Sequence, residues 1–305
     1  IGTYMQRKTI KDWFETIGIN TTPDNILFAT GSQNAICATI LGIFKSGDRI
    51  GTTALSFSGL KSIAKMVGVQ LVPLPEKSGH IYIEGLDQFC KTENLKGLDL
   101  IPDQSNPTTY SLNNSKRLFL GNLAQRLNLI IIEDAINRMF SDENYFPIYS
   151  YAPQNTVYIF SVSKFLSAGL RVAYMISPEV CKQQIENALY NMNLMVSPLN
   201  LEIVNRIFNS SLLPFLISQK RKALIERNKI VDEILTGYEI LGTSTCCFRW
   251  LLLPHKWSGE DFEKATQQAG VQVFCAERFV IGKATPPKAV RICISAPKCI
   301  NELIK

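Results

Sequence analysis

The sequence predicts an α/β protein: a mostly parallel sheet with helices on both faces, followed by a smaller α+β C-terminal domain. Short, fully apolar segments, typical of buried parallel strands, alternate with segments of helical periodicity over residues 1–200. Beyond them, a long helical stretch precedes strands of the alternating, half-buried type. We therefore expect a large domain over residues 1–200 and a small domain over residues 201–305.

The large domain is expected to begin with a helix and then to alternate strands and helices. Gly18 ends the first helical pattern, and the turn Thr22-Pro23-Asp24 leads into the first strand. Ser115 is the expected N-cap of the last long helix. The expected helices are 5–17, 35–44, 59–67, 82–90 and 115–127, and the expected strands are 26–29, 49–52, 70–73, 98–102, 129–132 and a run from 156 to Ser161.

The small domain is expected to contain an antiparallel arrangement. Its predicted elements are a long helix over 201–235, an alternating strand over 247–253, a helix over 259–268, and strands over 271–274 and 290–294. The longest basic block, Lys220-Arg221-Lys222, lies within the long helical pattern. We interpret this block as a solvated helix face rather than a nucleic-acid patch.

Composition narrows the class of protein. With 46% hydrophobic and 19% charged residues, the chain is typical of a folded globular protein. No apolar run reaches the ~18 residues of a membrane span, and we expect a cytoplasmic protein. The eight cysteines form no C-x-x-C pair and only two histidines are present, so we expect reduced thiols and no metal site.

One stretch concentrates the chemistry. The apolar run that begins at residue 156 stops at Ser161-Val162-Ser163-Lys164, and Arg171 follows seven residues later. An unprotonated lysine amine condenses with an aldehyde, whereas hydroxyls and a guanidinium bind a phosphate dianion. These groups therefore suit an aldehyde that carries a phosphate.

Other polar side chains also follow expected strands. Ser32 and Gln33 come after the strand 26–29, at a turn into a helix, where free backbone amides favour an anion. Phe57, Asn106 and Asp134 follow later strands. Because ligands bind outside the carboxyl ends of the strands in such sheets, we expect these side chains to lie on one rim.

Each motif taken alone has a plainer explanation. A lone Ser-x-Ser-Lys is commonly a surface lysine, and Asp134 alone fits a helix N-cap. Asn106 before Pro107 is a good turn residue, and Phe57 fits a core aromatic. Arg291, inside an apolar strand, needs a carboxylate that is either a salt-bridge partner or a substrate. Their order and spacing together favour a common site.

The chain resembles the class I/II aminotransferases of pyridoxal phosphate fold type I, in order from residue 2 to residue 297. It is most similar to the 2-aminoadipate and kynurenine-type aminotransferases and to the aminotransferase-like effector domains of MocR-type transcription regulators. The resemblance is carried by Gly2 with Arg7, Ile10 and Trp13; Thr22-Pro23-Asp24; Gly31-Ser32-Gln33; Asn106-Pro107-Thr108; Glu133-Asp134; Ser161-Val162-Ser163-Lys164; Gly169-Leu170-Arg171; and Arg291.

The resemblance implies pyridoxal 5'-phosphate as cofactor, with Lys164 as its Schiff-base lysine and catalytic acid/base. Asp134 would pair with the pyridine nitrogen, Asn106 with the ring hydroxyl oxygen, and Phe57 would stack on the ring. Arg291 would receive the substrate α-carboxylate. The residues implied in phosphate binding are Ser32, Gln33, Ser161, Ser163 and Arg171.

The sequence departs from the family pattern at three places. The family usually has a tyrosine two or three residues after the pyridine-binding aspartate, but Ile136 and Asn137 stand there, which makes Asn137 a possible cofactor contact. The family's Asn-Pro-Thr-Gly ends here in Thr109. The usual acidic-Pro-x-Tyr motif before the stacking residue is replaced by residues 53–56.

Two functions are compatible with the resemblance. The first is an aminotransferase that moves an amino group between an amino acid and a 2-oxo acid. The alternative is the cofactor- and effector-sensing domain of a MocR/GntR-type regulator, in which a DNA-binding domain outside this chain would precede Ile1. The resemblance also implies a homodimer, and the family's N-terminal arm, which packs on the partner subunit, would precede Gly2.

Overall fold

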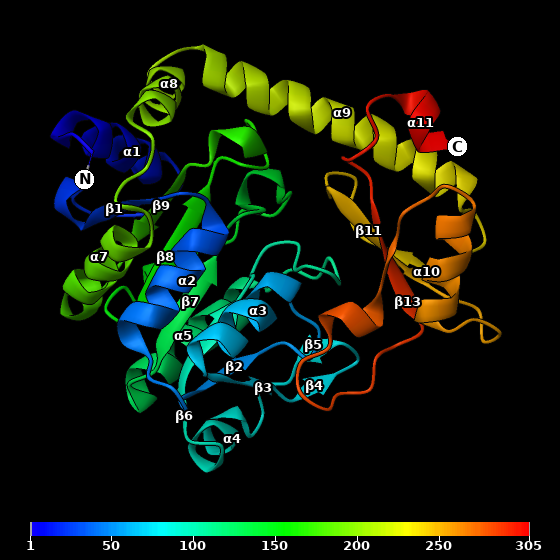
Figure 1. Cartoon of the computed structure of the whole chain (residues 1–305), viewed down its shortest axis with the longest axis horizontal. Helices are drawn as coiled ribbons and strands as arrows, with labels where there is room; N and C mark the ends of the chain where they lie inside the picture. The colour runs from blue at the N-terminus through cyan, green and yellow to red at the C-terminus, as the bar shows by residue number, and fades with distance from the viewer. Residues whose placement is uncertain (1, 305) are drawn as a thin grey trace.

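The computed structural model describes residues 2–304, so the expectation about what precedes Ile1 lies outside the described residues. A seven-stranded sheet and a four-stranded sheet are connected by one long helix, which crosses the top of Figure 1. The expected fold class, a mostly parallel sheet with helices on both faces plus a smaller α+β part, is confirmed. Within residues 2–304, no helix combines the length and apolar character needed to cross a membrane.

The central sheet consists of seven strands, which are β1 (Ile26–Ala29), β2 (Arg49–Thr52), β3 (Gln70–Pro73), β6 (Leu95–Leu100), β7 (Ile130–Asp134), β8 (Thr156–Ser161) and β9 (Ala173–Ile176). Their order across the sheet is β1-β9-β8-β7-β6-β2-β3. The pairs from β8 to β3 are parallel, whereas β9 runs antiparallel to both β8 and β1. The beginning of β9 therefore lies beside the carboxyl end of β8.

Helices cover both faces of this sheet. One face packs against α2 (Ser32–Ile43), α3 (Ser58–Val67) and α7 (Glu179–Asn193). The opposite face packs against α1 (Tyr4–Thr16), α4 (Leu86–Thr92), α5 (Asn114–Leu127), α6 (Ile148–Tyr151) and α8 (Pro198–Phe208). Short 3-10 helices complete this part at Pro23–Asn25, Arg138–Phe140 and Ala168–Leu170.

Alternation along the strands decides which face each side chain meets. In β8, Val157 and Ile159 lie in the cluster with α2, whereas Tyr158 and Phe160 lie in the cluster with α1. In β7, Ile132 belongs to the α2 side. Because successive side chains of a strand point to opposite faces, Asp134 shares the face of Ile132 and Glu133 takes the other.

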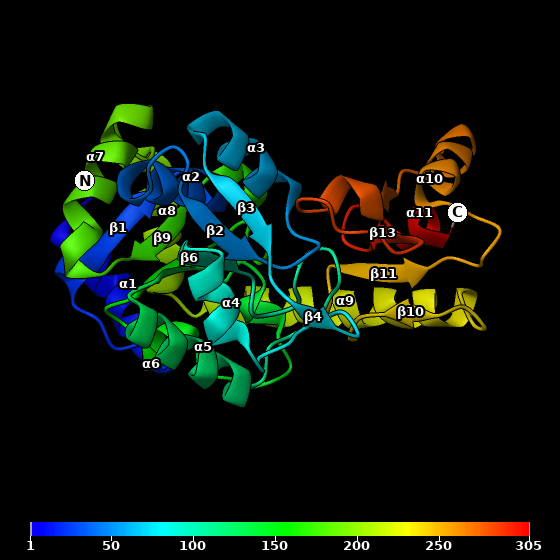
Figure 2. The ribbon, with the colours of Figure 1, turned by 90° about the horizontal axis from the view of Figure 1, so that it is seen from below.

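The C-terminal sheet is antiparallel and consists of β10 (Ile240–Leu241), β11 (Phe248–Leu252), β13 (Ala289–Cys293) and β12 (Phe274–Cys275), in that order. It packs with α10 (Gly259–Gln268) and the 3-10 helix Ala276–Phe279, whereas α11 (Ile300–Ile304) packs against α9 (Leu212–Ile234). The long helix α9 runs along this sheet in Figure 2. The division into domains at residue 200 stays a prediction.

Several expected elements need correction. The helix expected at 201–235 is two helices, α8 and α9, separated at residues 209–211. The helix expected at 82–90 begins only at Leu86, after a short hairpin of β4 (Glu76–Lys77) and β5 (His80–Ile81) that was not expected. The N-cap of α5 is Asn113 rather than Ser115, since the Asn113 side chain accepts from the Lys116 amide.

Candidate active site

A cavity of about 280 Å³ opens at the carboxyl ends of the parallel strands. Ten of the eleven predicted site residues line this cavity; Ser161 is the exception. The rest of its wall comes from residues that were not predicted. The lining residues are Ser32, Gln33, Phe57, Ile101, Asn106, Asp134, Ile136, Asn137, Ser163, Lys164, Ala168, Arg171, Cys247, Phe248, Arg291, Cys293 and Ser295.

Lys164 stands in the turn after β8 and is half-buried. Val162 and Phe165 flank the pair Ser163-Lys164 and are both buried, whereas Ser163 and Lys164 face the cavity. The Ser161 hydroxyl lies 2.9 Å from the Ser163 hydroxyl and 3.3 Å from the Val172 carbonyl oxygen. Ser161 therefore lies behind Ser163, and its predicted phosphate contact stays a prediction.

Arg171 reaches the same rim because β9 is antiparallel. It precedes β9 and lies across from the end of β8, where Ser161 pairs with Ala173. Its Nη2 donates to the Thr30 carbonyl oxygen at 2.8 Å. A Cβ atom on Gly31 would come within 2.5 Å of this guanidinium, and Gly31 has a φ of +91°. Gly31 is thus needed both for its backbone conformation and for the close approach of Arg171.

The N-terminal turn of α2 provides the opposite side of an anion site. The helix begins at Ser32, three residues earlier than expected, so the first backbone amides of α2 point out of its N-terminal end. The Ser32 hydroxyl is buried and has no hydrogen-bond partner. Gln33, which is exposed, lines the cavity beside it. Amides, an unsatisfied hydroxyl and the Arg171 guanidinium together suit a phosphate group.

Asp134 ends β7 and is only 4% exposed. Burial raises the pKa of its carboxyl group to about 7, although the Ile136 amide and the Lys164 ammonium both lower it. One carboxyl oxygen accepts from the Ile136 amide at 3.2 Å. A buried carboxyl group with this much remaining hydrogen-bonding capacity favours a cationic or proton-donating ligand.

Asn106 and Arg291 bring the two sheets together at the cavity. The Arg291 Nη1 donates to the Asn106 side-chain oxygen at 2.7 Å. The guanidinium lies over the rings of Phe248, Phe274 and Phe279, at 4.9 to 5.6 Å from their centroids. Burial lowers the pKa of Arg291, and its buried Nε has no partner. This cation is thus only partly satisfied and is suited to a carboxylate ligand.

Phe57 and Asn137 also lie on the wall of the cavity. Phe57 precedes α3, and its ring occupies the space that a Cβ atom on Gly59 would need. Asn137 is 2% exposed, and its Nδ2 donates to the Gln104 carbonyl oxygen at 2.9 Å. Thr109 adopts a φ of +65° at the place where the family has glycine. The possible cofactor contact of Asn137 stays a prediction.

Sequence reasoning missed the wall that the C-terminal part contributes. Cys247 precedes β11, which begins at Phe248; Cys293 ends β13, and Ser295 follows it. Burial raises the pKa of the Cys247 thiol to about 11. The types and spacing of these four residues do not indicate a site in the sequence. The pairing of Phe248 with Cys293 places them together at the cavity.

Comparison with known proteins gives a consistent picture. Residues 2–305 match the family model of aminotransferases of class I and II. The chain is 43% identical over 286 residues to the HTH-type transcriptional regulator YdeF of Bacillus subtilis, which covers 94% of this chain and 62% of that protein. It is 24% identical over 273 residues to the 2-aminoadipate transaminase of Thermus thermophilus, covering 86% of this chain and 68% of the transaminase. The chain thus spans about three fifths of the regulator's length.

Solved structures share the fold. An archaeal alanine:glyoxylate aminotransferase superposes with a TM-score of 0.90 at 17% identity, covering 99% of this chain and 78% of that one. The α-aminoadipate aminotransferase LysN of Thermus thermophilus, complexed with N-(5'-phosphopyridoxyl)-L-leucine, gives 0.87 at 20% identity, with coverages of 99% and 79%. The resemblance proposed from the sequence is confirmed: the chain belongs to the family of class I and II aminotransferases.

Proposed function

We propose that this chain binds pyridoxal 5'-phosphate and transfers an amino group between an amino acid and a 2-oxo acid. The observation that carries the proposal is the meeting of Lys164, Asp134, Asn106 and Arg171 around one cavity, with Arg291 bound to Asn106 on the same cavity. Two features of the structure fit this cofactor. The Ser32 hydroxyl is buried without a partner, and the Asp134 carboxyl group is buried without a fixed counter-ion at hydrogen-bond distance.

The residues of the chain have separate tasks in this proposal. Arg171, Ser163, the Ser32 hydroxyl and the first amides of α2 hold the phosphate, and the Asp134 carboxylate holds a proton on the pyridine nitrogen. Asn106 donates to the ring oxygen while Arg291 fixes its amide. When bound, the cofactor supplies an aldehyde and a ring that withdraws electrons from the substrate.

Lys164 and Arg291 act on the substrate. The Lys164 amine lines the cavity and would provide the covalent attachment point for the cofactor aldehyde; the same amine would accept and return a proton at the substrate α-carbon. The Arg291 guanidinium receives the α-carboxylate and thereby orients the α-carbon, the usual use of a preorganised arginine. The Phe248, Phe274 and Phe279 rings around it limit its contact with water.

Absorbance spectroscopy tests this proposal. Adding pyridoxal phosphate to the wild type should produce the visible band of a lysine-bound cofactor, and Lys164→Ala should abolish it. Amino acids should then convert that band to the spectrum of the aminated cofactor. A wild type that gives no visible band would falsify the cofactor assignment. A band that no amino acid converts would exclude amino transfer by this chain.

A second function is favoured by a specific finding, the 43% identity with the regulator YdeF over 94% of this chain. We propose as the alternative that the same cavity binds the cofactor and an amino-acid or 2-oxo-acid effector for a DNA-binding regulator, with little or no turnover. Asn137 at the position of the family tyrosine supports this reading. Cofactor binding with effector affinity but no spectral conversion would distinguish it from the enzyme.

We also propose a homodimer for either function. Large apolar side chains are exposed at the N-terminal end of α1, at the end of α7 and on α8, and Tyr190, Leu194 and Met195 among them line a cavity of about 270 Å³. Exposed apolar side chains of this kind are typical of protein contacts. Sedimentation of the purified chain should therefore give twice the monomer mass. The exposed residues are Tyr4, Met5, Tyr190, Met192, Leu194, Met195, Leu199 and Ile203.

A further inference from the structure

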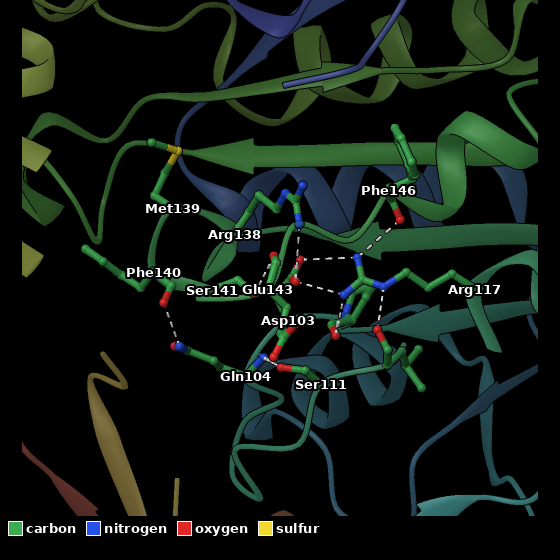
Figure 3. Close-up of polar contacts among 12 residues, drawn as sticks. Asp103, Gln104, Ser111, Arg117, Arg138, Met139, Phe140, Ser141, Glu143 and Phe146 are labelled. Carbon is green, nitrogen blue, oxygen red and sulfur yellow. Dashed lines mark hydrogen bonds and ion pairs between the residues drawn. The ribbon is translucent and has the colours of Figure 1, made fainter. Parts of the chain in front are cut away.

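Residues 137–142, which follow Asp134 at the end of β7, are held by Gln104 from one side. The Gln104 backbone carbonyl accepts from Asn137 Nδ2 at 2.9 Å. The Gln104 side-chain Nε2 donates to the Phe140 carbonyl oxygen at 2.9 Å (Figure 3). Gln104 is 2% exposed and has a φ of +44°. Left-handed backbone is unfavourable for a residue with a side chain, so the surrounding contacts must hold Gln104 in place.

The same segment is held from the C-terminal part of the chain by Thr245. This fully buried hydroxyl lies 2.6 Å from the Phe140 carbonyl oxygen, 2.8 Å from an Asp142 carboxylate oxygen and 3.2 Å from Gln104 Nε2. It can donate its one proton to Phe140 or Asp142 while it accepts from Gln104. Arg221 of α9 adds a bond to Asp142 at 2.5 Å.

Gln104 and Thr245 are each two residues away from a residue that lines the candidate active site. Gln104 precedes Asn106 by two residues, and Asn106 lines the cavity. Thr245 precedes Cys247 by two residues, where the cavity wall of β11 begins. β11 is paired with β13, and within that pair Trp250 stands opposite Arg291. A shift of the C-terminal sheet would therefore move Asn106 in two ways: through the contact between Thr245 and Gln104, and through the direct Arg291 contact.

We propose that Gln104 and Thr245 form a latch that sets the position of Asn106 and Asn137 relative to the C-terminal sheet. Both are positioning residues, because neither lines the cavity. The inference rests on the proposed function in one respect, the contact of Asn106 with the cofactor ring oxygen. Ligand carboxylates that move Arg291 would, through the latch, also change how Asn106 holds the cofactor.

Two substitutions of Thr245 separate a latch from a mere space-filling residue. Thr245→Val keeps the shape but removes the hydroxyl, so residue 245 loses its hydrogen bonds with Gln104, Phe140 and Asp142, whereas the direct bond from Gln104 to Phe140 remains. Thr245→Ser restores the hydroxyl with less bulk. Thr243→Val is the matched control, because Thr243 is exposed and its hydroxyl makes longer contacts, 3.2 Å to the Thr245 hydroxyl and 3.4 Å to Gln104 Nε2, with no hydrogen bond to Phe140 or Asp142.

The latch predicts a change at the cofactor. Thr245→Val should weaken pyridoxal phosphate binding about ten-fold and shift the pH midpoint of its visible band, since the donor to the ring oxygen is displaced. Thr245→Ser and Thr243→Val should stay within about two-fold of the wild type, with unshifted midpoints. If Thr245→Val folds and leaves both the affinity and the midpoint unchanged, the latch is overturned while the proposed function stands.

Hydrogen exchange of the cofactor-free protein gives a readout that does not depend on the proposed function. Amides of residues 138–142 should exchange at least ten-fold faster in Thr245→Val than in Thr243→Val, and other segments should not change. Gln104→Met removes the Nε2 contacts with Phe140 and Thr245 from the opposite side, and it should also speed exchange of residues 138–142, which covers the case in which the valine variant fails to fold. Equal exchange rates in all variants would overturn the latch even if the wild type binds no cofactor.

Discussion

Glu133 and Asp134 are neighbours at the end of β7, equally buried, and on opposite faces of the central sheet. Burial raises the pKa of each carboxyl group to about 7. The Glu133 carboxylate accepts hydrogen bonds from the backbone amides of Ile148 and Tyr149 at 2.9 and 2.8 Å, at the start of α6. Asp134 accepts from one amide and otherwise faces the cavity. Burial alone therefore does not mark a functional acid, whereas unused hydrogen-bonding capacity that faces a cavity does.

The difference also separates stability from binding. Glu133 holds a helix start in place, and its hydrogen bonds offset much of the cost of burying the carboxyl group. The Asp134 carboxyl group has fewer such hydrogen bonds. Its burial therefore destabilises the folded protein without ligand, and a bound cationic group would offset this cost. Asp99 shares the face of Asp134, is 3% exposed, and has an oxygen without a partner. Burial and the nearby Asp134 raise the pKa of Asp99 well above its usual range.

Replacing Asp134 by asparagine should have the largest effect on ligand binding. The variant keeps the shape but loses the charge that pairs with the pyridinium, so we expect pyridoxal phosphate affinity to fall about 100-fold, within the range for a charged hydrogen bond. Equilibrium titration of the visible band measures this change. The cofactor-free variant should be no less stable than the wild type in urea. A variant with wild-type affinity would contradict the assigned role.

Glu133→Gln should give the opposite pattern. The amide offers one acceptor oxygen where the carboxylate offers two, so one buried backbone amide of Ile148 or Tyr149 loses its partner. We expect the free energy of unfolding to fall by about 2 kcal/mol. Cofactor affinity should stay within about two-fold of the wild type. Urea unfolding measures the stability, and the same titration measures the cofactor affinity. A large loss of affinity at unchanged stability would contradict the structural role of Glu133.

The pH dependence of stability should show the smallest effect within any single pH unit. The folded protein binds more protons than the unfolded chain between pH 4 and pH 7, since the folded pKa of Asp134 is raised from 3.8 to about 7. Stability contributed by this group is therefore present below about pH 4 and lost as the pH rises toward 7. Asp134→Asn should remove up to about 1.4 kcal/mol per pH unit of that slope.

Urea unfolding of both proteins at pH 5, 6 and 7, without cofactor, measures the difference. Groups with a lowered pKa act in another window: the Arg278 guanidinium and the Cys275 amide hold the pKa of Glu263 at about 2. Their contribution is lost only as the pH falls below 4.5. Parallel stability curves for the wild type and Asp134→Asn between pH 5 and 7 would show that the Asp134 pKa is not raised.

Much of the central sheet was predictable because its signals are local. The bounds of β1, β2, β3 and α10 agree with the expected ones, since apolar runs and turn residues delimit them. The break between α8 and α9 was missed because apolar spacing continues across it. The hairpin of β4 and β5 was missed because two-residue strands are too short to show periodicity.

The site was predictable where reactive residue types follow strands. Lys164, Asp134 and Asn106 are such cases, and the structure brings them to one cavity. Ser161 also follows a strand, yet its hydroxyl points toward Ser163 and the Val172 carbonyl. The direction of this hydroxyl depends on tertiary packing and could not be predicted from the local sequence. Cys247 and Cys293 reach the cavity through pairing between strands more than forty residues apart, which no local pattern encodes.

The antiparallel direction of β9 limits how this protein can change in length. Ser161 and Ala173 are paired, so residues 162–172 form a closed connection that delivers both Lys164 and Arg171 to the cavity. An inserted residue there would move one of the two groups away from the other. The Ser78-Gly79 turn between β4 and β5 touches no such group. Related sequences should therefore vary in length at that turn and keep the length of 162–172.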